Sequence, residues 1–108
     1  MIMLEKEAGM KGYLFAEIEI TDPEAYKQYM QLAPPAIAAF GGRYLVRGGE
    51  PELIEGEPPP KRTVLLEFES PAHARAFLRS PQYQKAAAIR RRASRGRFLL
   101  LTGVAAPA

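Results

Sequence analysis

The chain has 108 residues, which is room for one domain with a single hydrophobic core. Hydrophobic residues make up 47% and charged residues 25% of the sequence, a balance that excludes a disordered chain. Cysteine is absent, which excludes disulfides, thiol chemistry and thiolate zinc sites. No apolar run approaches the ~20 residues that span a bilayer, so we expect a cytoplasmic protein with no membrane partner.

The net charge is +3, and much of the excess comes from Arg90, Arg91, Arg92, Arg95 and Arg97. Cations near the end of a helix complement its dipole, and we favour this interpretation. Two alternatives stay open, a patch that binds RNA or another anion and a phosphorylation site at Ser94. Because one local cluster is weaker evidence than a basic face spread over a domain, nucleic acid is not an expected partner.

The first strand is expected at residues 12–20. Residues 1–10 before it show no periodicity and are predicted to be a flexible extension, since Met10 would itself make a sensible start. Residues 12–20 alternate with the period of a half-buried strand. One face would carry Leu14, Ala16, Ile18 and Ile20, and the other Tyr13, Phe15, Glu17 and Glu19.

A helix is expected next, because Thr21 or Asp22 can cap it and Pro23 suits the first turn. An apolar stripe then follows at helical spacing: Tyr26, Tyr29, Met30, Ala33, Ile37 and Phe40. Pro34 and Pro35 interrupt this stripe, so a kink or a restart is predicted there. The pair Gly41-Gly42 ends the helix.

The second half of the chain is expected to contain three strands and two helical pieces. Strands are predicted at 43–49 and 62–69, with a short hairpin or bulged extension at 52–55 and a loop at 57–61. Ser70-Pro71 and Ser80-Pro81 each place a capping serine before a proline, which predicts helices at about 71–79 and 81–93. A fourth strand at 97–103 and a flexible tail at 105–108 complete the chain.

The order β-α-β-β-α-β predicts one ferredoxin-like α+β domain over residues 11–104, with a four-stranded antiparallel sheet that carries both helices on one face. The other face would then be bare. It would expose Tyr13, Phe15, Leu45, Leu65 and some of residues 98–101, too much apolar area to leave in water. Because a two-fold symmetric patch is self-complementary, we expect a homodimer.

Four segments resemble one known family in order and spacing: KGYLFAEIEITDPEAYKQY, APPAIAAFGGRYLVRGG, LLEFES and SPQYQKAAAIR. They are similar to the domain of unknown function 1330 (DUF1330) family over about residues 11–104. The resemblance implies a dimeric α+β barrel, in which two ferredoxin-like sheets close into one barrel. Relatives of that fold include cofactor-independent monooxygenases, muconolactone isomerase and stress-responsive proteins. The family itself has no settled activity.

Charged residues on the bare face are the first candidate site. Strand alternation places Arg43 and Arg47 on one face of the second strand, while Glu67 and Glu17 fall on the corresponding faces of their own strands. We favour a structural role, in which Arg47 and Glu67 form an ion pair that fixes the dimer register or lie at a solvated barrel mouth. The functional alternative is a site in which Arg47 binds an anionic oxygen of a small acid and Glu67 is the catalytic proton donor or acceptor.

Three tyrosines, Arg90 and His73 are the remaining candidates. Tyr26, Tyr29 and Tyr83 are expected in the core, with Tyr83 as the candidate that reaches a ligand. Arg90 is added because it coincides with the arginine of the family's final helix. His73 lies in a solvated first turn, and one histidine without other ligands does not make a metal centre. No metal and no cofactor are expected, since no glycine-rich phosphate loop is present.

The sequence does not decide whether a reaction is catalysed. We expect a small, anionic organic molecule in the barrel cavity, either merely bound or acted on without a cofactor. A non-catalytic dimeric module for interaction or stress response is the first alternative. An RNA-associated protein that acts through residues 90–97 is the second.

Overall fold

Seven elements follow one another along residues 9–105, the part of the chain that the computed structural model describes. They are β1 (Gly12–Ile20), α2 (Pro23–Ala39), β2 (Arg43–Gly49), β3 (Arg62–Phe68), α3 (Pro71–Arg79), α4 (Pro81–Ala93) and β4 (Ser94–Thr102). This is the predicted order. Most of the predicted flexible ends, residues 1–8 and 106–108, lies outside the described residues.

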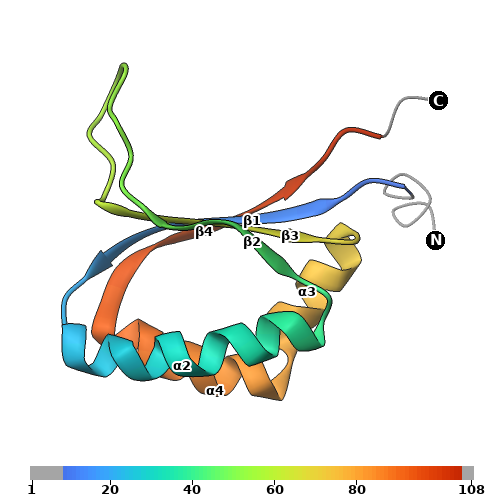
Figure 1. Cartoon of the computed structure of the whole chain (residues 1–108), viewed down its shortest axis with the longest axis horizontal. Helices are drawn as coiled ribbons and strands as arrows, with labels where there is room; N and C mark the ends of the chain where they lie inside the picture. The colour runs from blue at the N-terminus through green and yellow to red at the C-terminus, as the bar shows by residue number, and fades with distance from the viewer. Residues whose placement is uncertain (1–8, 106–108) are drawn as a thin grey trace.

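The four strands form one antiparallel sheet in the order β2-β3-β1-β4. All three helices lie on the same side of this sheet, and the opposite side is bare (Figure 1). The predicted ferredoxin-like α+β fold is therefore confirmed. Among residues 9–105, no helix is both long and apolar enough to cross a bilayer.

The helix starts follow from local side-chain chemistry. Asp22 accepts a hydrogen bond from the backbone N–H of Ala25 at 3.2 Å and caps α2. Ser70 and Ser80 cap α3 and α4 in the same way, each followed by proline at the first helical position. Ser80 also ends α3, because its hydroxyl donates to the carbonyl of Phe77 at 2.7 Å.

The predicted restart at Pro34 and Pro35 is wrong, since α2 runs through both as one helix of 17 residues. Each proline removes one hydrogen bond to the preceding turn. The carbonyls left free belong to Met30 and Gln31, which are both exposed, so water can satisfy them. Burial of the neighbouring side chains, Ala33, Ala36 and Ile37, holds the helix on the sheet.

Two predicted strand boundaries are corrected. Residues 50–61, here called the arm, contain no strand, so the predicted extension at 52–55 is wrong. The arm leaves the sheet on the side away from the helices (Figure 1). β4 begins at Ser94 rather than at residue 97, because α4 passes into it without a loop. The Ser94 hydroxyl donates to the carbonyl of Arg90 at 2.7 Å and closes that junction.

The core lies between the sheet and the helices. Its largest fully buried side chains are Tyr26, Tyr83, Phe68, Phe77 and Leu14. Tyr26 of α2 and Tyr83 of α4 are 1% and 2% exposed, as predicted for core tyrosines. A buried phenol needs a partner for its hydroxyl, and this requirement leads to the candidate site.

Candidate functional site

A β-bulge in β2 decides which arginine faces which side of the sheet. Arg43 is in register with Glu67, but the register shifts at Leu45, so that Arg47 lies opposite Val64. The extra residue reverses the side-chain alternation beyond it. Arg43 therefore faces the bare side, whereas Arg47 faces the helices. The prediction that both share one face is wrong.

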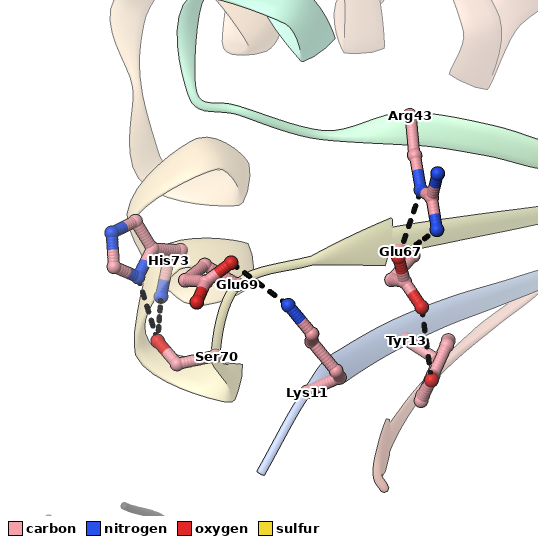
Figure 2. A network of polar contacts seen from close by, with 7 residues as sticks. All are labelled: Lys11, Tyr13, Arg43, Glu67, Glu69, Ser70 and His73. Atoms are coloured by element: carbon pink, nitrogen blue, oxygen red, sulfur yellow. Dashed lines mark hydrogen bonds and ion pairs between the residues drawn. The ribbon is translucent and has the colours of Figure 1, made fainter. Parts of the chain in front are cut away.

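The predicted pair between Arg47 and Glu67 consequently does not form. Figure 2 shows the partners that Glu67 has instead, on the bare face. Arg43 Nε donates to Glu67 Oε1 at 2.8 Å, and the Tyr13 hydroxyl donates to Glu67 Oε2 at 3.0 Å. The Glu67 side chain is 15% exposed, so these bonds hold a largely covered carboxylate.

These partners also set the proton affinity of Glu67. The hydrogen bond from Arg43, followed by that from Tyr13, lowers the pKa of Glu67 against the opposing effect of burial. The same bond to Glu67 raises the pKa of the Tyr13 phenol. At neutral pH Glu67 is thus an ionised group and a poor proton donor. Its catalytic role stays a prediction, for which the geometry offers no substrate-facing position.

The other bare-face charges are paired across neighbouring strands. Arg97 Nε donates to Glu17 Oε1 and Arg95 Nε to Glu19 Oε1, both at 2.6 Å. Glu17, a predicted ligand-binding residue, is thus held by an arginine of its own chain. At the other end of the sheet, Lys11 binds Glu69 at 2.9 Å, and this bond lowers the pKa of Glu69 (Figure 2).

Between these polar rows, apolar side chains cross the whole bare face. The registers place Val46, Leu65, Phe15 and Leu99 side by side on β2, β3, β1 and β4. Leu101 follows Leu99 on the same face, and the two are 47% and 38% exposed. Phe98 and Leu100 point the other way, into the core. The expectation of a bare apolar face is borne out in this geometry.

A small cavity lies on the opposite side, between the sheet and the helices. Its volume is about 30 Å³, enough for one or two water-sized groups. Apolar core residues form much of its wall. Its polar lining consists of four tyrosines and two arginines, namely Tyr26, Tyr29, Tyr44, Tyr83, Arg47 and Arg62. The exposed side chains among its lining are Met30 and Arg47, so it opens to solvent between α2 and β2.

Both arginines rest on aromatic rings rather than on carboxylates. The Arg47 guanidinium lies 4.5 Å from the ring centroid of Tyr44, and that of Arg62 lies 5.5 Å from Tyr26. The Nε of Arg62 is buried and has no hydrogen-bond partner within the described part of the chain. Nor does any carboxylate of residues 9–105 form an ion pair with Arg47 or Arg62.

A third arginine reaches the cavity through a tyrosine pair. Arg90 Nε donates to the Tyr83 hydroxyl at 3.2 Å, and the Tyr83 and Tyr29 hydroxyls are 3.0 Å apart. Either hydroxyl of this pair can donate to the other, so one phenol proton is used between them and the second is free for another acceptor. Burial raises the pKa of Tyr29 far above its ordinary value, so the phenol stays a neutral donor.

The other two cavity tyrosines are also neutral. Burial raises the pKa of both Tyr26 and Tyr44, although the nearby guanidiniums of Arg62 and Arg47 act in the opposite direction. The cavity therefore presents phenol and guanidinium donors. None of the described residues that line it is a carboxylate or a histidine, so it offers hydrogen-bond donors without a general base.

The predicted site residues are divided between the two faces of the sheet. Arg47, Tyr83 and Arg90 were candidates and do gather here, whereas Arg43, Glu17 and Glu67 lie on the other face. Arg62 was missed, because a strand's first residue beside a proline-rich loop gives no sign of burial. In the structure, Gly48 lies against the Arg62 guanidinium, and its φ of 72° favours glycine at that position.

Other parts of the described chain offer less. A second hollow of about 400 Å³ lies at the base of the arm, where Glu19, Lys61 and Arg62 line it together with Ile18, Ile20, Pro59 and Pro60. His73 is exposed and bonded to the Ser70 hydroxyl at 2.7 Å (Figure 2). Among residues 9–105, no group of three or more acidic, cysteine or histidine residues is placed to hold a metal ion.

Comparison with known proteins places these features in a family. Residues 11–104 match the family described as a domain of unknown function, DUF1330. No match is found among curated proteins. The fold is similar to that of a protein of unknown function from Rhodopseudomonas palustris, with a TM-score of 0.72 and 18% identity over 93% of this chain and 87% of that one.

Two further structures share the fold at lower similarity. SnoaB, a cofactor-independent oxygenase from Streptomyces nogalater, matches with a TM-score of 0.52 and 13% identity over 92% of this chain and 97% of its own. A dimeric ferredoxin-like protein from Thermobifida fusca matches with a TM-score of 0.54 and 15% identity over 91% and 94%. Identities this low show a common fold and nothing about activity.

Proposed function

This chain belongs to the DUF1330 family, and we propose that it is a homodimer in which each subunit binds a small organic anion between its sheet and its helices. The observation that carries the proposal is Arg62. Its guanidinium lines the cavity with a buried Nε that has no partner among the described residues. The Tyr26 hydroxyl interacts with this guanidinium, but a buried N–H without an acceptor still costs free energy, which an anionic ligand would recover.

The size of the cavity favours one part of such a ligand. About 30 Å³ accommodates a carboxylate or an enolate oxygen and not a whole organic molecule. The charged group would enter between Met30 and Arg47, where the cavity opens. The planar guanidinium forks of Arg47 and Arg62 suit a carboxylate, and the body of the ligand would lie at the mouth against Tyr44.

The set of donors also favours binding over proton abstraction. Tyr29, backed by Tyr83 and Arg90, would donate a hydrogen bond to the ligand oxygen. A reaction that begins by removal of a proton needs a base, and the described cavity lining provides neither a carboxylate nor a histidine. The proposal is therefore a binding site that can polarise a carboxylate or carbonyl group.

The homodimer is supported by the bare face. The row of Val46, Leu65, Phe15 and Leu99 is a continuous apolar strip that a second copy would remove from water. The dimeric relative from Thermobifida fusca has the same fold. The ligand site proposed here would thus lie outside the interface, in place of the barrel interior expected from sequence.

The RNA-associated alternative is weakened by the surroundings of its arginines. Arg90 donates a hydrogen bond to the Tyr83 hydroxyl, and its guanidinium carbon lies 4.3 Å from the ring centroid of Phe98. Arg95 and Arg97 form ion pairs with Glu19 and Glu17. The sequence cluster therefore does not form one basic patch on the surface, which is what phosphate binding would need.

The test follows the side-chain Nε–H signals of the arginines by NMR during titration with benzoate. We expect the Arg62 signal to shift saturably, with a Kd of about 1 mM or tighter. Benzamide has the same shape without the charge and is expected to cause no saturable shift. The variant Arg62→Gln should lose benzoate binding, as reported by the signal of Arg47.

Arg43→Gln is the matched control, because it removes a guanidinium from the same sheet on the opposite face. It should leave the benzoate response of Arg62 unchanged. An equal response to benzamide, or benzoate binding that survives Arg62→Gln, would contradict an anion site at this arginine. So would the absence of any shift at about 10 mM benzoate.

A further inference from the structure

The arm, residues 50–61, is an exposed projection that contributes nothing to the sheet or the core. It contains four glutamates and a single lysine: Glu50, Glu52, Glu55, Glu57 and Lys61. Within the described part of the chain, none of these glutamates forms an ion pair. Near its middle, Leu53 and Ile54 are 48% and 84% exposed. Exposed apolar side chains beside unpaired charges are typical of a surface that binds another protein.

We propose that the arm docks on a second copy of this chain, where its glutamates pair with the arginines at the start of β4. The inference rests on the proposed homodimer and adds to it a specific contact. The acidic arm of one protomer would contact the Arg92–Arg95 segment of the other. Two such contacts would form in each dimer, because a two-fold axis repeats every contact.

The strand directions make this arrangement possible. β3 runs antiparallel to both β1 and β2, and β4 runs antiparallel to β1, so the two edge strands β2 and β4 run in opposite directions. A two-fold axis parallel to the strands would bring β2 of one copy to β4 of the other. They would meet antiparallel, and eight strands would alternate around a closed barrel without an exposed edge.

The same axis brings the charges together. Arg62, where the arm rejoins the sheet, is in register with Ile18, which is in register with Gly96 near the start of β4. The arm and the β4 arginines therefore lie at the same end of the sheet, but at opposite edges. An axis parallel to the strands keeps the ends matched and exchanges the edges, which places each arm at the other copy's arginines.

The direction of the arm agrees with this placement. It rises on the bare side of the sheet, the side from which a second copy would approach (Figure 1). On that copy, Arg92 is an exposed residue at the end of α4, and the Arg95 side chain is 78% exposed despite its pair with Glu19. Arg95 is shared with Glu19, but within residues 9–105 Arg92 forms no ion pair, so Arg92 is the cation that the acidic arm would pair with first.

Two charge-reversed variants test the contact. The first carries Glu52→Lys and Glu55→Lys in the arm, and the second carries Arg92→Glu and Arg95→Glu. In either homodimer both contacts would repel, so we expect the dimer Kd of each variant to rise about tenfold or more. When the two variants are mixed, both contacts become attractive again. Native mass spectrometry of the mixture should then show mostly the heterodimer.

The control replaces the second variant by one with Arg79→Glu and Lys85→Glu. This variant has the same change of charge on exposed helix positions away from the start of β4. In its mixture with the arm variant, one of the two arm contacts in a heterodimer is still repulsive. We therefore expect less heterodimer in this control mixture than in the first mixture.

Each other outcome overturns the proposal. A statistical 1:2:1 mixture of the first two variants, or dimer Kd values equal to that of the wild type, would remove the arm contact and leave the homodimer standing. A monomeric wild type would remove the homodimer and the arm contact together. Benzoate binding by Arg62 is measured separately and is decided by neither result.

Discussion

The protonation state of Glu67 is set by the side chains that hydrogen-bond to its carboxylate. The two bonds from Arg43 and Tyr13 favour its ionised form, so its pKa in the folded protein lies below its value in the unfolded chain. A group of this kind stabilises the fold above the unfolded pKa, about 4.3 for glutamate. That stabilisation is lost as the pH falls through the lower, folded value.

The substitution Glu67→Gln should therefore flatten the acid side of the stability profile. From about pH 5 down to about pH 2.5, the melting temperature of the variant is expected to fall less than that of the wild type. The measurement is thermal unfolding by circular dichroism at each pH, with the exposed arm residue changed in Glu57→Gln as the control. Parallel profiles for wild type and Glu67→Gln would show that the bonds to Glu67 do not favour its charged form.

Residue types alone identified some members of the site and not others. Tyr83 and Arg90 could be singled out because a helical stripe and a family position pointed to them. Arg62 could not, since its burial depends on contact with Tyr26 of another element and on the space left by Gly48. Arg47 was predicted to pair with Glu67, and a bulge in β2 separates the two residues.

Among the helices and strands, features formed by residues close in sequence could be predicted. Each cap is a contact between residues three apart, so Asp22, Ser70 and Ser80 could be recognised in the sequence. The bulge at Leu45 could not, because two opposed residues on one strand are visible only with the partner strand in place. That single extra residue moved Arg47 from the bare face to the cavity side.

β1 and β4 approach each other closely at Gly96, and this contact can be tested by substitution. Gly96 has a φ of 152°, and a Cβ there would overlap the carbonyl oxygen of Glu17 on the neighbouring strand. Because both partners are backbone atoms, the β1–β4 pairing would have to shift. Gly96→Ala is expected to destabilise the fold by about 2–4 kcal/mol, as measured by urea unfolding.

Gly41→Ala is the matched control for this substitution. Gly41 also has a positive φ, 74°, but nothing lies within 4 Å of the added Cβ. Only the intrinsic cost of a left-handed residue applies there, about 1 kcal/mol. Equal losses for the two variants would mean that the contact with Glu17 does not constrain the sheet.

In the whole molecule, the two faces of the sheet differ in chemistry, and the proposed function gives each face a different role. In the function proposed above, a second copy would close the face that carries Glu67, Phe15 and Leu65, and the face that carries Arg47 and Arg62 would hold the ligand. The sequence indicated the first role through its clean alternation in β1. It assigned the ligand to the same face, because nothing in one strand's pattern tells which side an arginine reaches after a bulge.

Sedimentation velocity of the wild type and of Leu65→Glu tests this division most directly. The wild type should sediment at twice the chain mass of 12.0 kDa. Leu65→Glu puts a charge into the middle of the apolar row, so it should sediment as a folded monomer, with circular dichroism to confirm the fold. A wild type that stays monomeric at about 100 μM, or a Leu65→Glu variant that remains a dimer, would contradict closure of the bare face by a second copy.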